Sequence, residues 1–267
     1  MRVRESDKPV SGFICSHPKS GRTWMRFALA RYLTQVYDID VDVSLQTMWT
    51  ILPNYDGGNR VKGRDLRAYE YNDRADVPLV LSSHLSFDRE LFEDSPVAFI
   101  IRSPYDVTVS NYFQKSKVER TFHGTMPEFV RDTDVGIQNN IRYWNTWSEQ
   151  LLSNGDLTLS YEALRASPVE GFRQMAVHLG LKDDPEAAAE AIRYASIDNM
   201  RKIELAEGII NLDYDQSDPD ALRVRRAKVG GYEDYLGADD VAFICDVCER
   251  ELTPATKRLL TEHGIEY

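Results

Sequence analysis

The 267-residue sequence predicts a single α/β domain with a central, mostly parallel sheet flanked by helices. Short apolar runs without polar alternation recur along the chain, which is typical of parallel strands that are covered on both faces. Segments with helical spacing alternate with these runs, and strands that alternate with helices favour a parallel sheet. Because the sequence has no internal repeat or low-complexity segment, we expect one domain over residues 1–267.

The expected strands are four short apolar runs, and the helices between them have recognisable first residues. The runs are 12–16, 79–82, 97–101 and 157–160. Capping residues followed by proline predict helix starts at 103–104, 167–168, 184–185 and 253–254. Apolar residues at helical spacing predict a helix after the first strand and another over 136–153. The connections 38–78 and 204–223 are long, as functional loops often are.

Composition excludes several classes of protein. A net charge of -11 argues against general nucleic-acid binding, which needs a basic surface. No run approaches the roughly 20 apolar residues of a membrane span. The first 13 residues lack the apolar core of a secretory signal, and three cysteines do not indicate a disulfide framework, so we expect a cytoplasmic protein. Any anion site must then be a local basic pocket.

The segment His-Pro-Lys-Ser-Gly-Arg-Thr-Trp at 17–24 lies between the first strand and the first helix. Ligands of open α/β sheets bind at this end of the strands. Ser20 and Gly21 allow a tight turn that directs backbone N–H groups and a helix N-terminus at an anion. Lys19 and Arg22 add positive charge. The order of residues is not that of a Walker A loop, and an ordinary turn with surface cations is the alternative.

Thr23 and Trp24 complete the pattern Pro-Lys-Ser-Gly-Arg-Thr-Trp, which resembles the 5′-phosphosulfate loop of the cytosolic-type sulfotransferases, usually PKSGTTW. Arg22 replaces the first threonine. The resemblance implies a P-loop-like fold and a donor, 3′-phosphoadenosine 5′-phosphosulfate (PAPS), with the 3′,5′-bisphosphate PAP as product and no metal. It also implies that residues 19–24 bind the donor, with Trp24 stacking on adenine.

His84 follows the second expected strand directly, at the same edge of the sheet as Lys19. An imidazole has an ordinary pKa near neutrality, so it can accept a proton from an acceptor hydroxyl. A lone histidine is more often a surface or core residue. The segment Ser-Ser-His-Leu resembles the family's Lys-Thr-His-Leu, which implies that His84 is the catalytic base and that Lys19 assists at the sulfonate. Ser82 replaces the family's lysine.

Arg102 ends the third strand, and Ser110 lies two turns into the helix that follows. An arginine at a strand end and a serine on a helix surface are the ordinary alternative. The order of strand, arginine and Asp-Val-x-Val-Ser resembles the family's 3′-phosphate site, so these two residues are expected to bind that phosphate. Two anion sites at one sheet edge fit a doubly phosphorylated nucleotide.

Two later segments resemble the rest of the family's nucleotide site. Tyr161 is expected to contact adenine, although a core role is nearly as plausible, and Ser196 stands at a second adenine position. Arg225 and Arg226 lie in a basic segment that resembles the family's closing loop and are expected to bind the 3′-phosphate. Ala227 replaces the first glycine of that loop and is expected to contact the donor with these arginines.

The sequence therefore predicts a sulfotransferase that moves a sulfonate group from PAPS to a hydroxyl or amine of a small-molecule acceptor. A P-loop-like nucleotide kinase and a non-catalytic nucleotide-binding protein are the alternatives. The protein is expected to be a monomer or homodimer without nucleic-acid partners. An aromatic wall for the acceptor is one interpretation of Trp49, Tyr55, Tyr69 and Tyr71, and buried helix cysteines are the interpretation of Cys245-x-x-Cys248.

Overall fold

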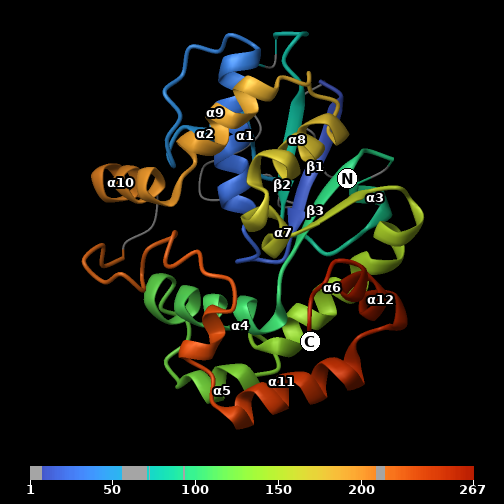
Figure 1. The fold of residues 1–267 in the computed structure, drawn as a ribbon, viewed down its shortest axis with the longest axis vertical. Helices are drawn as coiled ribbons and strands as arrows, with labels where there is room; N and C mark the ends of the chain where they lie inside the picture. The colour runs from blue at the N-terminus through green and yellow to red at the C-terminus, as the bar shows by residue number, and fades with distance from the viewer. Residues whose placement is uncertain (1–7, 56–70, 72, 93, 209–213) are drawn as a thin grey trace.

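The computed structural model describes residues 8–55, 71, 73–92, 94–208 and 214–267. Its centre is a four-stranded sheet in the order β2-β1-β3-β4, and every neighbouring pair is parallel (Figure 1). The strands are β1 Val10–Ser16, β2 Leu79–Ser83, β3 Val97–Ile101 and β4 Leu157–Ser160. All four predicted strands and the predicted fold class are confirmed.

The sheet is buried on both faces, which explains the absence of polar alternation in its strands. Phe13 and Cys15 of β1 point into one apolar cluster, whereas Ile14 between them points into a second cluster on the opposite face. All three side chains are fully buried. Each strand therefore needs apolar residues at consecutive positions.

Helices cover both faces of the sheet (Figure 1). α1, α8 and α9 pack on the Ile14 face, and α4, α6, α11 and α12 pack on the Phe13 face. Their bounds are α1 Arg22–Val36, α2 Met48–Ile51, α3 Arg89–Phe92, α4 Pro104–Phe113, α5 Met126–Arg131, α6 Ile137–Ser153, α7 Tyr161–Ala166, α8 Pro168–His178, α9 Pro185–Tyr194, α10 Ile197–Glu207, α11 Ala238–Glu251 and α12 Pro254–Glu262. A π-helical turn, η2, spans Gln114–Val118 and a 3₁₀ turn, η3, spans Gly231–Asp234.

The predicted helix starts are confirmed, with proline in the first turn of α4, α8, α9 and α12. The side chain of Asp184 accepts the N–H groups of Glu186 and Ala187, as a capping residue should. The long connection predicted over 204–223 is wrong at its start, because its first residues end α10. Among the described residues, no helix has both the length and the apolar character needed to cross a bilayer.

Candidate active site

The carboxyl ends of all four strands open into one cavity of about 270 Å³. β1 leads to Lys19, β2 to His84, β3 to Arg102 and β4 to Tyr161, and these four residues line the cavity together. Parallel strands end at the same edge, so segments far apart in the sequence meet there. Residues from β1, β2 and β3 thus meet at one site, as predicted from the sequence.

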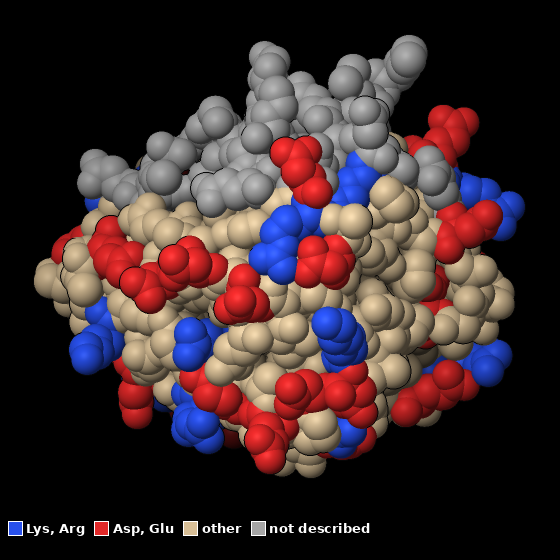
Figure 2. Space-filling model, turned by 90° about the horizontal axis from the view of Figure 1, so that it is seen from above, with Lys and Arg blue, Asp and Glu red and all other residues tan. Residues whose placement is uncertain are grey.

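The cavity is strongly basic although the protein is acidic. Eight of its lining residues are cationic and two, Asp106 and Glu119, are acidic. The cations are Lys19, Arg22, Arg102, Arg165, Arg223, Arg225, Arg226 and Lys228. The chain carries a net charge of -11, and acidic side chains gather in several groups on the face shown in Figure 2. A local basic pocket of this kind is what an anionic ligand requires in an acidic protein.

The loop after β1 has the backbone of an anion-binding turn. Lys19 has a φ of +70° and Gly21 a φ of +102°, so the chain curls sharply before α1 begins. A Cβ on Gly21 would lie 2.6 Å from Cδ2 of Tyr161, so only glycine fits this position without a shift. The N-terminus of α1 lies at this mouth of the cavity, because residues of its first turn line it, and the positive end of a helix favours an anion.

Ser20 lies beneath this turn and is fully buried. Its hydroxyl has no hydrogen-bond partner among the residues that the structure describes. A buried hydroxyl without a partner is unfavourable unless a ligand or water satisfies it. The observation fits a loop that holds an anion, although Ser20 itself is not among the residues that line the cavity.

Arg22, Thr23 and Trp24 all line the cavity from the first turn of α1. The ring of Trp24 lies 6.1 Å from that of Tyr161 in an edge-to-face arrangement, and the guanidinium of Arg165 lies 5.5 Å from the Trp24 ring. These aromatic side chains form an apolar, partly cationic wall that suits a purine base.

His84 has the geometry of a neutral base. Its Nδ1–H donates to the carbonyl oxygen of Ser16 at 2.6 Å. Because a carbonyl oxygen only accepts, Nδ1 carries the proton and Nε2 keeps its lone pair. Burial, followed by the positive charge of Arg22, holds the pKa of His84 well below 6.5. The imidazole is therefore neutral at pH 7, with its proton on Nδ1.

Lys19 lies among other cations and loses part of its proton affinity. Burial, with the added repulsion of Arg223 and Arg225, lowers the pKa of Lys19 to about 7. Its Nζ donates to Oε1 of Gln114 at 2.9 Å, which directs the side chain toward α4 and η2. An anion bound beside Lys19 would favour its charged form.

Arg102, which follows β3, lies against the loop after β1. Its guanidinium lies 4.2 Å from the ring of Tyr161 and makes an ion pair of 3.3 Å with Asp106. It also donates to the carbonyl oxygens of Lys19 and Lys228, at 3.2 and 3.1 Å. Ser110 lines the cavity from the same helix as Asp106.

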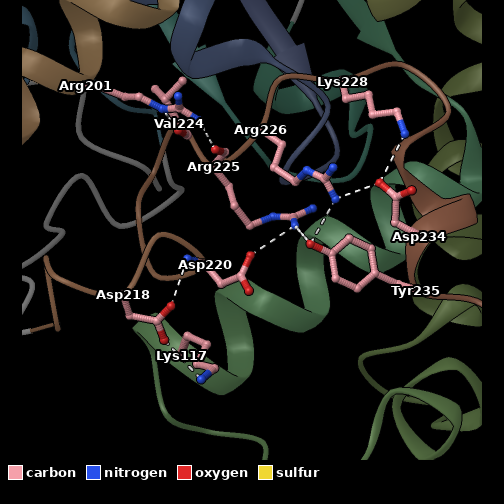
Figure 3. A network of polar contacts seen from close by, with 10 residues as sticks. All are labelled: Lys117, Arg201, Asp218, Asp220, Val224, Arg225, Arg226, Lys228, Asp234 and Tyr235. Carbon is pink, nitrogen blue, oxygen red and sulfur yellow. Dashed lines mark hydrogen bonds and ion pairs between the residues drawn. The ribbon is translucent and has the colours of Figure 1, made fainter.

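Two arginines of the segment 223–232, here called the closing loop, converge on one phenol (Figure 3). Arg225 and Arg226 both donate to the hydroxyl of Tyr235, at 2.8 and 3.2 Å. Carboxylates balance their charges, because Asp220 lies 3.3 Å from Arg225 and Asp234 lies 2.7 Å from Arg226. Both arginines also line the cavity, so the network gathers positive charge at its rim.

Helix α10 supports the closing loop from the other side. The buried carboxylate of Glu204 accepts the N–H of Arg223 at 2.6 Å and that of Val224 at 3.4 Å. Arg201 donates to the carbonyl oxygens of Val224 and Arg225. The loop backbone is thereby fixed although the sequence has no regular element there.

The sulfotransferase domain family matches residues 11–256. The chain belongs to this family. It is 24% identical over 208 residues to rat sulfotransferase 2A2, and the aligned region covers 75% of this chain and 68% of the rat protein. Among solved structures it is similar to mouse sulfotransferase SULT7A1 complexed with PAP, with a TM-score of 0.67, 19% identity and coverage of 98% of this chain and 90% of that one. A retinol dehydratase in complex with retinol and PAP gives a TM-score of 0.63 at 17% identity, covering 97% of this chain and 84% of that one.

Two predicted binding features of this sulfotransferase lie apart from the cavity, namely the second adenine contact at Ser196 and the aromatic wall for the acceptor. Ser196 caps α10 by accepting the N–H of Asn199, and its neighbour Ile197 lines the cavity instead. The aromatic wall is not found among its described members, because Trp49 and Tyr71 pack against the apolar core and Tyr55 is buried in it. Tyr69 lies outside the described residues. Of the two helix cysteines, Cys248 is buried and Cys245 is half-buried.

Sequence reasoning missed several lining residues of the sulfotransferase. They are Asp106, Gln114, Glu119, Arg165, Met200, Arg223 and Lys228. Asp106 belongs to the Asp-Val-x-Val-Ser order of the predicted 3′-phosphate site, but an acid in a first helical turn is an ordinary signal and indicated no role of its own. Gln114 and Glu119 follow the serine of the predicted 3′-phosphate site, and no motif marked them. Arg223 and Lys228 stand in the basic cluster that drew attention to the closing loop.

Proposed function

We propose that this sulfotransferase binds PAPS in the basic cavity and transfers its sulfonate to a hydroxyl or amine of a small-molecule acceptor. The observation that carries the proposal is the meeting of eight cationic residues and one neutral imidazole at the carboxyl edge of a single sheet. A cytoplasmic location, a single domain over residues 1–267 and a monomeric or homodimeric state belong to the same proposal.

The charges suit a nucleotide with two separate phosphate groups. Lys19, Arg22 and the first N–H groups of α1 would bind the 5′-phosphosulfate. Arg102, Ser110 and the arginines of the closing loop would bind the 3′-phosphate. Trp24 and Tyr161 line the same cavity with their rings in contact, and adenine would pack against them. PAP-bound relatives of the same fold support this placement.

The transfer step uses His84 as the base. Nε2 accepts the proton of the acceptor O–H or N–H while the acceptor atom attacks sulfur. The bond between sulfur and the bridging oxygen breaks, and its electron pair stays on the 5′-phosphate of the leaving PAP. Lys19 and the loop amides stabilise the charge that grows on that oxygen. Positioning and electrostatics thus provide most of the rate enhancement, as in phosphoryl transfer.

The test compares wild-type protein with His84→Ala in a transfer assay that uses labelled PAPS and a panel of phenols, alcohols and amines. The variant should lose at least a hundredfold in turnover, because general-base catalysis contributes about 10²–10⁴. Its affinity for PAP, measured by calorimetry, should change less than threefold. His123→Ala, which removes an exposed histidine, is the matched control. Normal turnover in His84→Ala would refute the assigned base.

The same assays separate the alternatives. A nucleotide kinase would bind nucleoside triphosphates in a magnesium-dependent manner and would not consume PAPS. A non-catalytic binding protein would bind PAP but transfer no sulfonate to any acceptor. Transfer from PAPS with release of PAP is expected only of the sulfotransferase.

A further inference from the structure

Asp106 is a carboxylate in the cavity wall that the proposed reaction does not use. It lies in the first turn of α4 and is only 3% exposed. Oδ2 accepts the N–H of Gly230 at 2.9 Å, and Oδ1 accepts the N–H of Tyr232 at 3.0 Å. Oδ2 also lies 3.3 Å from the guanidinium of Arg102. One carboxylate therefore holds both the closing loop and the arginine at the end of β3.

Arg102 extends this contact to a third segment. Its Nη1 donates to the carbonyl oxygen of Lys19 in the loop after β1, and its Nη2 donates to that of Lys228 in the closing loop. The pair of Arg102 and Asp106 thus joins the first anion loop, the start of α4 and the closing loop. These are the three segments that would surround the two phosphate groups.

We propose that Asp106 is a positioning residue, which latches the closing loop over the 3′-phosphate end of the donor and fixes the orientation of Arg102. The inference rests on the proposed function, since it names the phosphate that the latched loop serves. Asp106 acts through backbone N–H groups and a guanidinium, and it makes no contact with the reacting atoms in this scheme.

Removing the charge of Asp106 has two opposing effects on the affinity for a phosphate. The carboxylate by itself repels a nearby phosphate, so its removal would strengthen binding. Asp106 contributes one negative charge, however, and it helps to order a loop that carries several positive charges. The closing loop brings four cations to the cavity, namely Arg223, Arg225, Arg226 and Lys228. Loss of the latch frees the backbone of the closing loop at Gly230 and Tyr232 and leaves Arg102 without its anionic partner, while Glu204 still holds the start of the loop. The loss of ordered positive charge outweighs the removal of one negative charge, so Asp106→Asn should weaken binding.

A purely structural ion pair would give a different pattern. If Asp106 only stabilised the fold, its loss would weaken all nucleotides alike. If it latches the 3′-phosphate site, its loss should weaken PAP but spare adenosine 5′-monophosphate (AMP), which lacks the 3′-phosphate. The ratio of the two dissociation constants is therefore the diagnostic quantity.

The experiment measures PAP and AMP binding by calorimetry for wild-type protein, Asp106→Asn and Asp246→Asn. The control is Asp246→Asn, which also removes one negative charge. Asp246 and Arg250 form an exposed ion pair on α11 and, like Asp106 and Arg102, are four residues apart. Asp106→Asn should raise the PAP dissociation constant at least tenfold and the AMP constant less than threefold. Asp246→Asn should change neither by more than twofold.

Equal losses for PAP and AMP, unchanged PAP binding, or tighter PAP binding in Asp106→Asn would each overturn the latch. Failure of the wild-type protein to bind PAP would instead overturn the proposed function. Should the variant not fold, amide hydrogen exchange of the wild-type protein gives the answer. The N–H groups of Gly230 and Tyr232 should be protected before nucleotide is added, and exchange at the rate of an open loop would refute the latch.

Discussion

Lys19 connects the charge of the cavity to a measurable pH dependence of nucleotide binding. Burial and the neighbouring charges of Arg223 and Arg225 lower the pKa of Lys19 to about 7 in the free protein. Below pH 7 the ammonium group is charged and can bind a phosphosulfate directly. Above pH 7 it is neutral, and binding a bisphosphate requires the uptake of a proton. The affinity for PAP should therefore fall as the pH rises.

The magnitude follows from the two ionisation states. In the complex, the anionic ligand raises the pKa of Lys19 toward its ordinary value near 10.5. With a free pKa of about 7, the dissociation constant should rise about fivefold from pH 7 to pH 8 and about 50-fold from pH 7 to pH 9. The phosphate groups lose their last protons near pH 6, so they contribute little above pH 7.

Calorimetry of PAP binding between pH 7 and pH 9, in two buffers of different ionisation enthalpy, measures the dissociation constant and the number of protons taken up on binding. About half a proton should be taken up on binding at pH 7 and nearly one at pH 9. Lys19→Arg keeps its charge over this range and should remove the slope. A dissociation constant that stays within twofold from pH 7 to pH 9, or an equal slope in Lys19→Arg, would refute the reasoning.

Three further predictions concern the loops and the base. Gly21→Ala places a methyl group 2.6 Å from Tyr161 at a φ of +102°, so PAP affinity measured by calorimetry should fall at least tenfold, and binding within twofold of wild type would contradict this. Ala227 adopts a φ of +50°, which costs an L-residue about 1 kcal/mol. Ala227→Gly should therefore leave the melting temperature unchanged or slightly higher. The control Ala189→Gly, within α9, should lower the melting temperature by a few degrees. Because the pKa of His84 is well below 6.5, kcat/KM should hold down to pH 6 before it declines, and a decline that begins above pH 6.5 would show that another group is titrating.

The strands and the helix starts were predictable because local chemistry decides them. A strand covered on both faces needs a continuous apolar run, and Val97–Ile101 is such a run. A capping residue followed by proline favours a helix start through local contacts, as at Asp184 and Pro185, where the Asp184 side chain accepts the first N–H groups of α9. The meeting of Lys19, His84 and Arg102 was also predictable, since each follows a parallel strand and such strands end at one edge.

The contacts that hold the closing loop could not be predicted from the sequence. Asp106 lies more than 120 residues before Gly230, whose N–H it accepts, and no sequence spacing relates them. The sequence pattern places Glu204 in a loop, yet it lies in α10 and is fully buried against the closing loop. Ala227 could be recognised as a departure from the family's glycine, but only the backbone shows that it adopts the left-handed conformation that glycine would favour.

In the proposed function, one basic cavity binds an adenine nucleotide through two separate phosphate groups. Calorimetry of the wild-type protein in EDTA, with PAP and ADP compared at pH 7, tests it most directly. We expect PAP to bind at least tenfold more tightly than ADP, because only PAP carries a 3′-phosphate for Arg102 and the closing loop. ADP binding that equals or exceeds PAP binding would contradict it.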